Sequence, residues 1–162
     1  MLKRSRGFTL VEFVVVLVLV GILSAVGMGK MASRQTFDSL GYFDSVRQAV
    51  QYARRVAVAQ RRTVCVGVSA SALSMSQASS AGSSSCDTGV IDPATGSVFN
   101  LVVPTGITLC GSTASFQFDA LGRQSSGAAV TLSVIGDGLT RVVAVENETG
   151  YVHVGTPPAA CI

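Results

Sequence analysis

The sequence predicts an α+β fold, with a long N-terminal helix whose first half spans a membrane and whose second half packs on a C-terminal antiparallel β-sheet. Three observations indicate this. An apolar run covers residues 8–29, apolar residues at helical spacing follow up to residue 57, and from residue 63 the pattern alternates every second residue between turn-forming segments. Strands that follow one helix, without an internal repeat, are typical of a single α+β domain.

The first element is the apolar run at residues 8–29, which follows three basic residues, Lys3, Arg4 and Arg6. As a helix it is long enough to cross a hydrocarbon core of about 30 Å. The basic residues in front of it favour a cytoplasmic N-terminus. Glu12 interrupts the run, and an unpaired carboxylate at that depth costs several kcal/mol. The sequence therefore predicts a membrane helix whose single acid has a partner.

A cleaved secretory signal peptide is the alternative interpretation of this N-terminus, with a cleavage site near Leu23-Ser24-Ala25. The rest of the chain would then be a soluble secreted protein. The apolar run is long for a signal peptide, however, and Glu12 lies where such a peptide should carry no charge. Mass spectrometry of the mature N-terminus would separate the two interpretations.

The second element is an amphipathic helix over residues 30–62. Its predicted buried stripe recurs at intervals of three and four: Phe37, Leu40, Phe43, Val46, Val50, Ala53 and Ala57. The opposite side carries arginines at seven-residue spacing, which indicates a solvated face: Arg47, Arg54 and Arg61.

The remaining elements are strands. Residues 63–77 predict a hairpin, and the Ser- and Gly-rich residues 78–97 predict a long loop. Further strands are expected where apolar residues alternate between Gly-containing turns: 98–103, 107–110, 113–118, 129–135, 140–146 and 151–154. Short strands with polar breaks favour an antiparallel sheet.

Composition and charge restrict the function. Charged residues make up only 13% of the chain and hydrophobic residues 48%. Residues 30–62 hold seven basic and two acidic side chains, whereas residues 63–162 hold two basic and six acidic ones. This segregation is a weak indication of charged partners, and it could equally let neighbouring copies attract each other.

The side chains that catalysis needs are sparse. There is one histidine, His153, and no pair of carboxylates on a common element, so no base is available for a nucleophile. We therefore expect no enzyme activity and no cofactor. The cysteines are too far apart for a metal knuckle, and we expect no metal site. Asp87 and Asp92 lie in a Gly-containing loop that could hold a cation, but such residues more often stabilise turns.

The segment Gly7-Phe8-Thr9-Leu10-Val11-Glu12, behind a basic leader and before an apolar helix, resembles the class III signal of type IV pilins and type II secretion pseudopilins. The resemblance implies that a prepilin peptidase cuts between Gly7 and Phe8 and methylates Phe8. It also implies that Glu12 pairs with the N-terminal ammonium of a neighbouring subunit and so directs assembly. Many family members have a proline where this chain has Gly29, so whether the helix melts near Gly27 and Gly29 is open.

The second half is similar to H-type pseudopilins and to FimT/FimU-like or MSHA-type minor pilins. The segments that carry this similarity are "YARRVAVAQRRTVCVGV", "FQFDALGR" and "TRVVAVENETGYVHV". The resemblance implies four regions: a leader peptide at 1–7, a transmembrane helix at 8–29, its amphipathic continuation at 30–62 and a β-sheet domain at 63–162.

Four cysteines allow three disulfide connectivities. If the domain lies in an oxidising compartment, pairs should form. We favour Cys65–Cys86, which would fasten the Ser- and Gly-rich loop to its hairpin, and Cys110–Cys161, which would hold the C-terminal tail. Free buried thiols are the alternative.

The expected function is that of a structural minor pilin or pseudopilin, at the tip of a type IV pilus or a type II secretion pseudopilus. The chain would start in the inner membrane with its globular domain in the periplasm. Its partners would be other pilins, the membrane and the prepilin peptidase. The alternative is a DNA-binding minor pilin in natural transformation. Its candidate contacts are Arg54, Arg55, Arg61 and Arg62, but the acidic second half opposes phosphate binding and makes DNA an unlikely partner.

Overall fold

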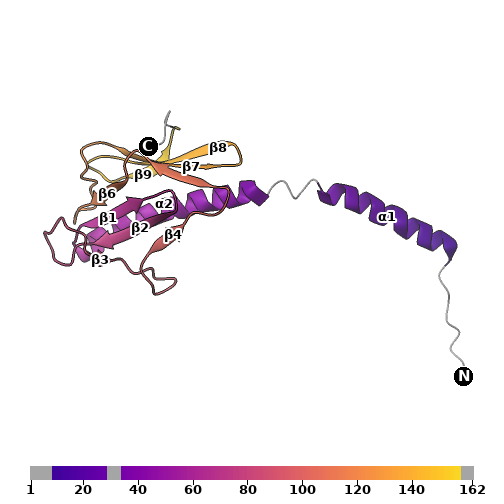
Figure 1. Ribbon diagram of the computed structural model, residues 1–162, viewed down its shortest axis with the longest axis horizontal. Coiled ribbons are helices and arrows are strands. Elements are labelled where there is room, and N and C mark those ends of the chain that lie inside the picture. The colour runs from indigo at the N-terminus through magenta and orange to yellow at the C-terminus, as the bar shows by residue number, and fades with distance from the viewer. Residues whose placement is uncertain (1–8, 29–33, 158–162) are drawn as a thin grey trace, which may run out of the picture. The chain divides into compact units, whose positions relative to one another are not determined.

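The computed structural model describes residues 9–28 and 34–157, except the side chains of residues 25–28, 34 and 35. The chain divides into two compact units, Met1–Arg34 and Gln35–Ile162, which are described separately below (Figure 1).

The first unit contains the helix α1, Leu10–Met28. Thr9 precedes the helix, and its Oγ1 accepts a hydrogen bond from the Glu12 backbone N–H at 3.3 Å, as an N-cap residue does. The large apolar side chains between Leu10 and Leu23 are 46–81% exposed. Within the part of the chain that is described, no helix is both long and apolar enough to cross a membrane. The predicted span of residues 8–29 includes Phe8 and Gly29, which lie outside that part.

The second unit is built on the helix α2, Arg34–Gln60. One face of α2 is buried, and its apolar members follow one another at intervals of one and three: Tyr42, Phe43, Val46, Ala49, Val50, Ala53, Val56 and Ala57. The predicted stripe is thus correct from Phe43 onward and wrong at its start, because Phe37 and Leu40 are 70% and 45% exposed. Ser39, between them, is fully buried, so the strands do cover this turn of α2, and Phe37 and Leu40 are exposed because they lie on another side of the helix.

Five strands form the first sheet: β1 Val64–Val68, β2 Ala72–Gln77, β3 Thr88–Gly89, β4 Asn100–Val102 and β6 Ser115–Phe118. Their order is β3-β2-β1-β6, and β4 also pairs with β2. All pairs are antiparallel, and the predicted hairpin at 63–77 is present as β1 and β2. The segment predicted as one long loop, 78–97, instead contains β3.

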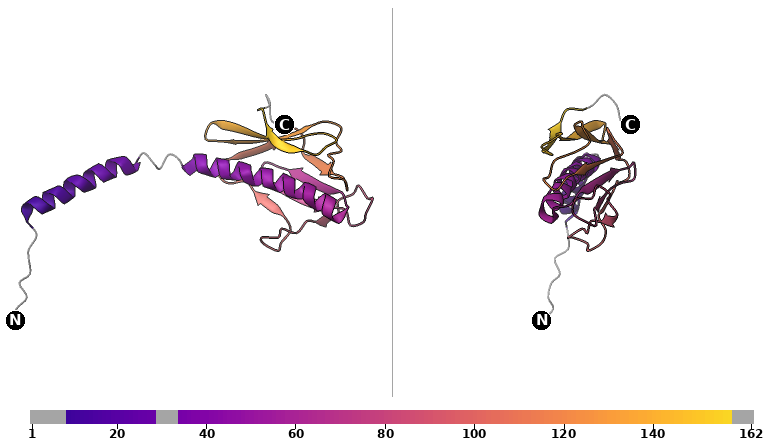
Figure 2. Two further views of the ribbon diagram at one scale, coloured as in Figure 1. Left: turned by 180° about the vertical axis from the view of Figure 1, so that it is seen from behind. Right: turned by 90° about the vertical axis from the view of Figure 1, so that its left-hand side faces the viewer.

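Four strands form the second sheet, in the order β5-β7-β8-β9: β5 Thr108–Gly111, β7 Val130–Gly136, β8 Leu139–Val145 and β9 Val152–Gly155. All of its pairs are antiparallel as well. The sequence predicts one sheet, whereas the domain has two that lie against α2 from different sides (Figures 1 and 2). The division arises because β5 pairs with β7 while the next strand, β6, pairs with β1.

The core lies between α2 and the two sheets. Phe116 and Phe118 of β6 meet edge to face with ring centroids 5.6 Å apart, a favoured aromatic geometry. The Tyr42 hydroxyl is buried without a hydrogen-bond partner among the described residues, and burial raises its pKa to about 12.

A disulfide joins Cys65 of β1 to Cys86, with the two Cα atoms 6.1 Å apart, so the first predicted pairing is present. The Thr63 hydroxyl also donates to the Ser83 carbonyl oxygen at 2.8 Å. The loop after β2 is therefore fastened to the start of β1 at two points. The second predicted pairing, Cys110–Cys161, is not described, because Cys161 lies outside the described residues.

Candidate functional site

The predicted assembly residue Glu12 lies in the first turn of α1, three residues after the capping Thr9. Thr9-Leu10-Val11-Glu12 matches the T-x-x-E pattern of a capping box, in which the glutamate also favours the helix N-terminus. The Glu12 side chain is exposed and has no ion-pair partner in the described part of the chain. Gly7 and Phe8, the predicted processing residues, lie outside the described residues.

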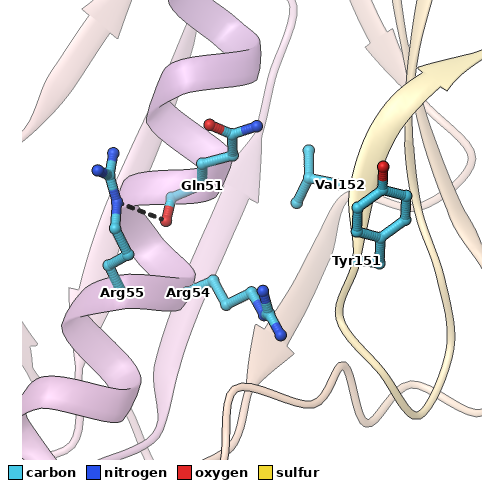
Figure 3. Close-up of a pocket in the computed structure, with 5 residues that line it drawn as sticks. All are labelled: Gln51, Arg54, Arg55, Tyr151 and Val152. Carbon is cyan, nitrogen blue, oxygen red and sulfur yellow. Dashed lines mark hydrogen bonds between the residues drawn. The ribbon is translucent and has the colours of Figure 1, made fainter.

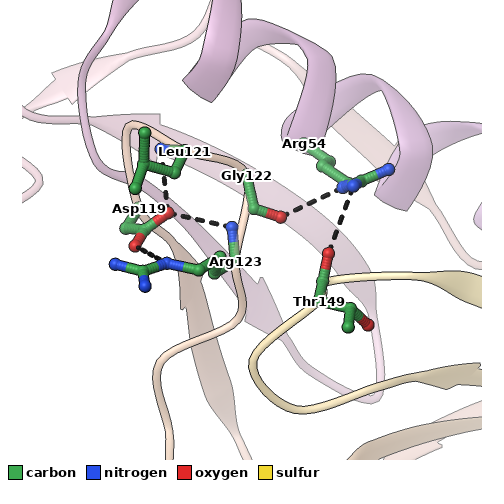
Figure 4. A network of polar contacts seen from close by, with 6 residues as sticks. All are labelled: Arg54, Asp119, Leu121, Gly122, Arg123 and Thr149. Carbon is green, nitrogen blue, oxygen red and sulfur yellow. Dashed lines mark hydrogen bonds and ion pairs between the residues drawn. The ribbon is translucent and has the colours of Figure 1, made fainter.

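Arg54, a predicted DNA contact, is instead bound within the domain (Figure 4). Its Nε donates to the Gly122 carbonyl oxygen at 3.0 Å and its Nη2 to the Thr149 carbonyl oxygen at 3.1 Å. These carbonyls belong to two turns that are far apart in sequence. One half-buried guanidinium thus holds both turns against α2.

The two turns also contact each other, and both require glycine. Gly122 and Gly150 are buried with φ of 76° and 62°, values that L-residues rarely adopt. A Cβ on Gly150 would overlap the carbonyl oxygen of Gly122, and a Cβ on Gly122 would lie 2.7 Å from Val58 Cγ2. The glycines therefore allow the two turns and α2 to approach closely.

The turn that contains Gly122 is organised by Asp119. Its Oδ1 accepts backbone N–H bonds from Leu121 and Arg123, both at 2.9 Å, and its Oδ2 lies 2.9 Å from Arg123 Nε (Figure 4). Burial would raise the pKa of the Asp119 carboxyl, but the hydrogen bonds from Arg123 and Leu121 lower it overall. The carboxylate is therefore kept charged, and it fixes the turn whose carbonyl Arg54 binds.

The first part of α2 is held by a second polar cluster. Arg141 Nη1 donates to the buried Ser39 hydroxyl at 3.1 Å and lies 3.4 Å from Asp137 Oδ1. Burial would raise the pKa of Asp137, but hydrogen bonds from Thr36, Arg141 and Ser39 lower it overall. A Cβ on Gly136 would lie 2.8 Å from Ser39 Cβ, so glycine is needed where β7 passes α2.

The four predicted DNA contacts are not all brought together, because Arg54 and Arg55 line one hollow whereas Arg61 and Arg62 are not part of its lining. Arg54 extends toward Tyr151, which immediately precedes β9, whereas Arg55 extends away from it (Figure 3). Arg62 Nη1 lies 3.5 Å from the Ala78 carbonyl oxygen, and Arg61 is exposed just beyond the end of α2. A hollow of about 230 Å³ between α2 and β9 is lined by Gln51, Arg54, Arg55, Tyr151 and Val152.

His153 of β9 lies beside this hollow. Its Nε2 is 2.7 Å from Glu146 Oε1, its Nδ1 is 2.9 Å from the Val154 carbonyl oxygen, and its ring stacks on Tyr151 at 5.5 Å. The hydrogen bonds to Glu146 and to the Val154 carbonyl raise the pKa of His153. The folded domain therefore binds this proton more tightly than a free histidine does, because the imidazolium can donate from both nitrogens.

Asp87 and Asp92, the loop acids, both accept hydrogen bonds from their own loops. Asp87 receives the Ser79 hydroxyl and the Ser79 N–H at 2.8 and 2.9 Å, and these bonds lower its pKa. Asp92 accepts the Ala94 N–H at 2.9 Å and the Thr95 hydroxyl at 3.1 Å. Both residues stabilise turns, the more common role that the sequence indicated.

Comparison with known proteins agrees with this architecture. Residues 2–28 match the model of the prokaryotic N-terminal methylation motif. The fold is similar to that of the type IV minor pilin FimU of Pseudomonas aeruginosa, with a TM-score of 0.58 and 17% identity over 79% of this chain and 98% of that one. A second crystal form of FimU gives a TM-score of 0.55 and 18% identity over 76% and 99% of the two chains.

The minor pseudopilin EpsH of the Vibrio cholerae type 2 secretion system is also similar, with a TM-score of 0.57 and 14% identity over 74% of this chain and 98% of that one. No curated protein matches the chain in sequence. The chain thus has the N-terminal motif and the fold of type IV pilin-like proteins, which confirms the resemblance predicted from the sequence. That fold is shared by the minor pilin FimU and by the minor pseudopilin EpsH.

Sequence reasoning missed the cap at Thr9 and the internal role of Arg54. The T-x-x-E pattern was a signal for the first. The second had no local signal, because the carbonyls that Arg54 binds lie 68 and 95 residues further along the chain.

Proposed function

We propose that this protein is a structural minor pilin or pseudopilin, which a prepilin peptidase cuts after Gly7 and methylates at Phe8. It then enters a type IV pilus or a type II secretion pseudopilus, at or near the tip. The observation that carries the proposal is the methylation motif at residues 2–28, joined to a domain with a pilin-like fold.

The exposure of α1 supports a role in assembly. Its large apolar side chains, from Leu10 to Leu23, are 46–81% exposed and are not covered by described residues of their own unit. Such a helix needs lipid or neighbouring helices around it. Before assembly α1 would lie in the inner membrane with the second unit in the periplasm, and afterwards among the helices of other subunits.

Glu12 would direct this step. Cleavage after Gly7 frees the ammonium group of Phe8, and in an apolar setting that charge and a neighbour's Glu12 carboxylate would neutralise each other. Before cleavage the Phe8 nitrogen belongs to a peptide bond, so the precursor should be held in the membrane without docking well.

The capping box offers a competing role for Glu12, and two substitutions separate the roles. Glu12→Gln removes the charge but keeps a side chain that can complete the box, whereas Glu12→Val removes both. If charge pairing directs assembly, both variants should be processed normally but recovered from sheared filaments at least roughly tenfold less than wild type. Breaking one side of a buried pair costs about 3–5 kcal/mol.

Thr9→Ala is the matched control, since it removes the cap and leaves the carboxylate. Its recovery should stay within about threefold of wild type, because an N-cap contributes about 1 kcal/mol. Wild-type recovery of Glu12→Gln, together with a loss for Glu12→Val and Thr9→Ala, would assign Glu12 to capping and contradict the pairing role. Absence of the wild-type chain from filaments would contradict the proposed function itself.

The second predicted disulfide is part of the proposal. Cys110 and Cys161 would pair in the periplasm and hold the C-terminal tail on the second sheet, with a stabilisation of about 2–4 kcal/mol. Peptide mapping without reduction should recover the two cysteines in one linked peptide. A peptide that links Cys161 to any other residue would contradict the pairing.

DNA binding has less support than filament assembly. Arg54 and Arg62 donate hydrogen bonds to backbone carbonyl oxygens of the domain, and of the four predicted contacts only Arg55 and Arg61 are exposed. Binding to a phosphate backbone requires several cations that are free at once.

A further inference from the structure

The outer side of α2 carries an apolar hollow that the proposed function does not use. It has a volume of about 420 Å³ and lies between α2 and the segment 92–101. Tyr52, Phe99 and Leu101 line it, and the first two rings lie 6.1 Å apart. Tyr52 is fixed by the hydrogen bond from its hydroxyl to the Ile91 carbonyl oxygen at 3.0 Å. The hollow is therefore lined by rings that are held in place and still partly exposed.

Exposed apolar side chains also lie on the opposite face of the segment that forms one wall of the hollow. Ile91, Val98 and Val102 are 53%, 57% and 62% exposed, and Ile91 pairs with Val98 in an isolated bridge. Val102 lies on β4, whose only described strand partner is β2. This outer face is separate from the hollow, so the case for a docking site rests on the residues that line the hollow itself.

One positive charge lies at the rim. Arg55 lines the hollow and is exposed, and its Nε donates only a long 3.4 Å hydrogen bond to the Gln51 carbonyl oxygen of its own helix. No carboxylate of the described residues forms an ion pair with it. Asp92 lines the same hollow, but its oxygens accept hydrogen bonds from Ala94 and Thr95. The rim therefore offers a guanidinium that an external carboxylate can bind.

We propose that this hollow is a docking site for another subunit of the filament, which inserts an aromatic or branched apolar side chain next to a carboxylate that binds Arg55. The inference rests on the proposed function, because it names a contact inside that assembly. A nucleic acid fits less well, since the hollow is apolar and its described lining offers one free cation rather than a row of them.

The test uses the full chain in cells. A photoreactive amino acid at Ala94, an exposed hollow residue, should crosslink to a different pilin-like subunit. Mass spectrometry should place the link within a few residues of an Asp or Glu that adjoins a large apolar residue. Arg55→Glu should reduce this crosslink roughly fivefold or more, because it replaces an attractive charge pair by a repulsive one.

Arg61→Glu is the matched control for charge, since Arg61 is exposed and lines neither hollow. It should change the crosslink by less than about twofold. Replacement of the partner's Asp or Glu near the link by Lys should restore the crosslink in the Arg55→Glu variant, because the two charges would attract each other again.

The apolar part of the contact is tested at Ala94 itself, because it is exposed and its replacement leaves the rings of the hollow in place. Ala94→Glu puts a charge where the partner's apolar side chain would enter, so it should lower recovery of the chain from filaments. Ala81→Glu, in another exposed loop, makes the same change away from the hollow and should leave recovery unchanged.

Several results would overturn the docking site: crosslinks only to nucleic acid, lipid or a second copy of this chain, or equal effects of Arg55→Glu and Arg61→Glu. If any of these results is obtained although the wild-type chain is recovered in filaments, only the proposed docking site is contradicted. If the wild-type chain is absent from filaments, the proposed function fails with it.

Discussion

The two helices of this chain differ in where their partners lie. The described side chains of α1 are exposed on all sides, whereas α2 buries one face under two sheets. Polar contacts hold α2 at two places, through Ser39 to Arg141 and through Arg54 to two turns. Substitutions in α2 should therefore change the stability of the domain, and substitutions in α1 should change assembly without changing that stability.

Tyrosine fluorescence can follow the unfolding of the second unit alone. The chain has three tyrosines and no tryptophan, and Tyr42, Tyr52 and Tyr151 all lie in the second unit. Urea unfolding of the full chain in detergent, followed by this signal, gives the free energy of unfolding used in the predictions below.

The largest effect is expected at Gly150. Gly150→Ala adds a Cβ that overlaps the Gly122 carbonyl oxygen and strains a residue with φ of 62°, so we expect a loss of roughly 2–5 kcal/mol. Gly138→Ala is the control, because φ there is 78° but no atom lies within 4 Å of the new Cβ. It should cost only about 1–2 kcal/mol. Equal losses would show that backbone strain, not the contact between turns, makes Gly150 necessary.

Arg54 and Arg55 provide a neighbouring pair on α2 itself. Arg54→Met leaves the Gly122 and Thr149 carbonyl oxygens without their donor and should cost about 2–4 kcal/mol. Arg55→Met, on the exposed side, should change the free energy of unfolding by no more than about 0.5 kcal/mol. A similar loss for both would show that the contacts of Arg54 with the two carbonyl oxygens contribute no more to stability than the exposed side chain of Arg55.

A matched pair of valines compares the helices directly. Val46→Ala removes two methyl groups from a side chain with 0% exposure and should cost about 2 kcal/mol. Val16→Ala makes the same change in α1, where the side chain is 46% exposed, and should leave the unfolding of the second unit unchanged. Destabilisation by Val16→Ala would break the comparison, because α1 would then contribute to the stability of the domain.

The smallest effect is a pH dependence from His153. Its pKa is raised in the folded domain, mainly by Glu146, so the folded state binds the proton more tightly than the unfolded state. The resulting stability is fully present below the ordinary histidine pKa of about 6.5 and is lost as the pH rises through the higher folded-state value. Between about pH 5.5 and 8.5 the wild type should lose stability relative to His153→Gln. Glu146→Gln should reduce the dependence but not abolish it, because the Val154 carbonyl also raises the pKa of His153, and a dependence that persists in full in His153→Gln would assign it to other groups.

Local sequence patterns predicted much of the fold. The strands at 129–135 and 140–146 were predicted within one residue of β7 and β8, because alternation and the turn at Gly136-Asp137-Gly138 are both local signals. The division into two sheets was not predictable in this way, since alternation does not reveal that β6 pairs with β1. Phe37 and Leu40 were assigned to the core because their spacing continues the period of the apolar stripe, whereas the side of α2 that is buried at this turn bears Ser39.

The site shows the same limit. The motif around Glu12 lies in consecutive residues and was recognisable, whereas the role of Arg54 depends on turns that only the folded chain brings together. The sequence indicated a solvated arginine row, and two of its three members, Arg47 and Arg54, are instead half-buried.

The pairing of β1 with β6 has a consequence for the order in which the domain can fold. The hairpins β1–β2 and β7–β8 pair strands that are close in sequence. The pairing of β1 with β6, however, cannot form until Phe118, the partner of Val64, has been synthesised. As the chain is made from its N-terminus at about 5–20 residues per second, one edge of β1 stays unpaired for several seconds. Because distant pairings form slowly, we expect the arrival of β6 to be the late step, and the nascent first sheet to be most open to misassociation before it.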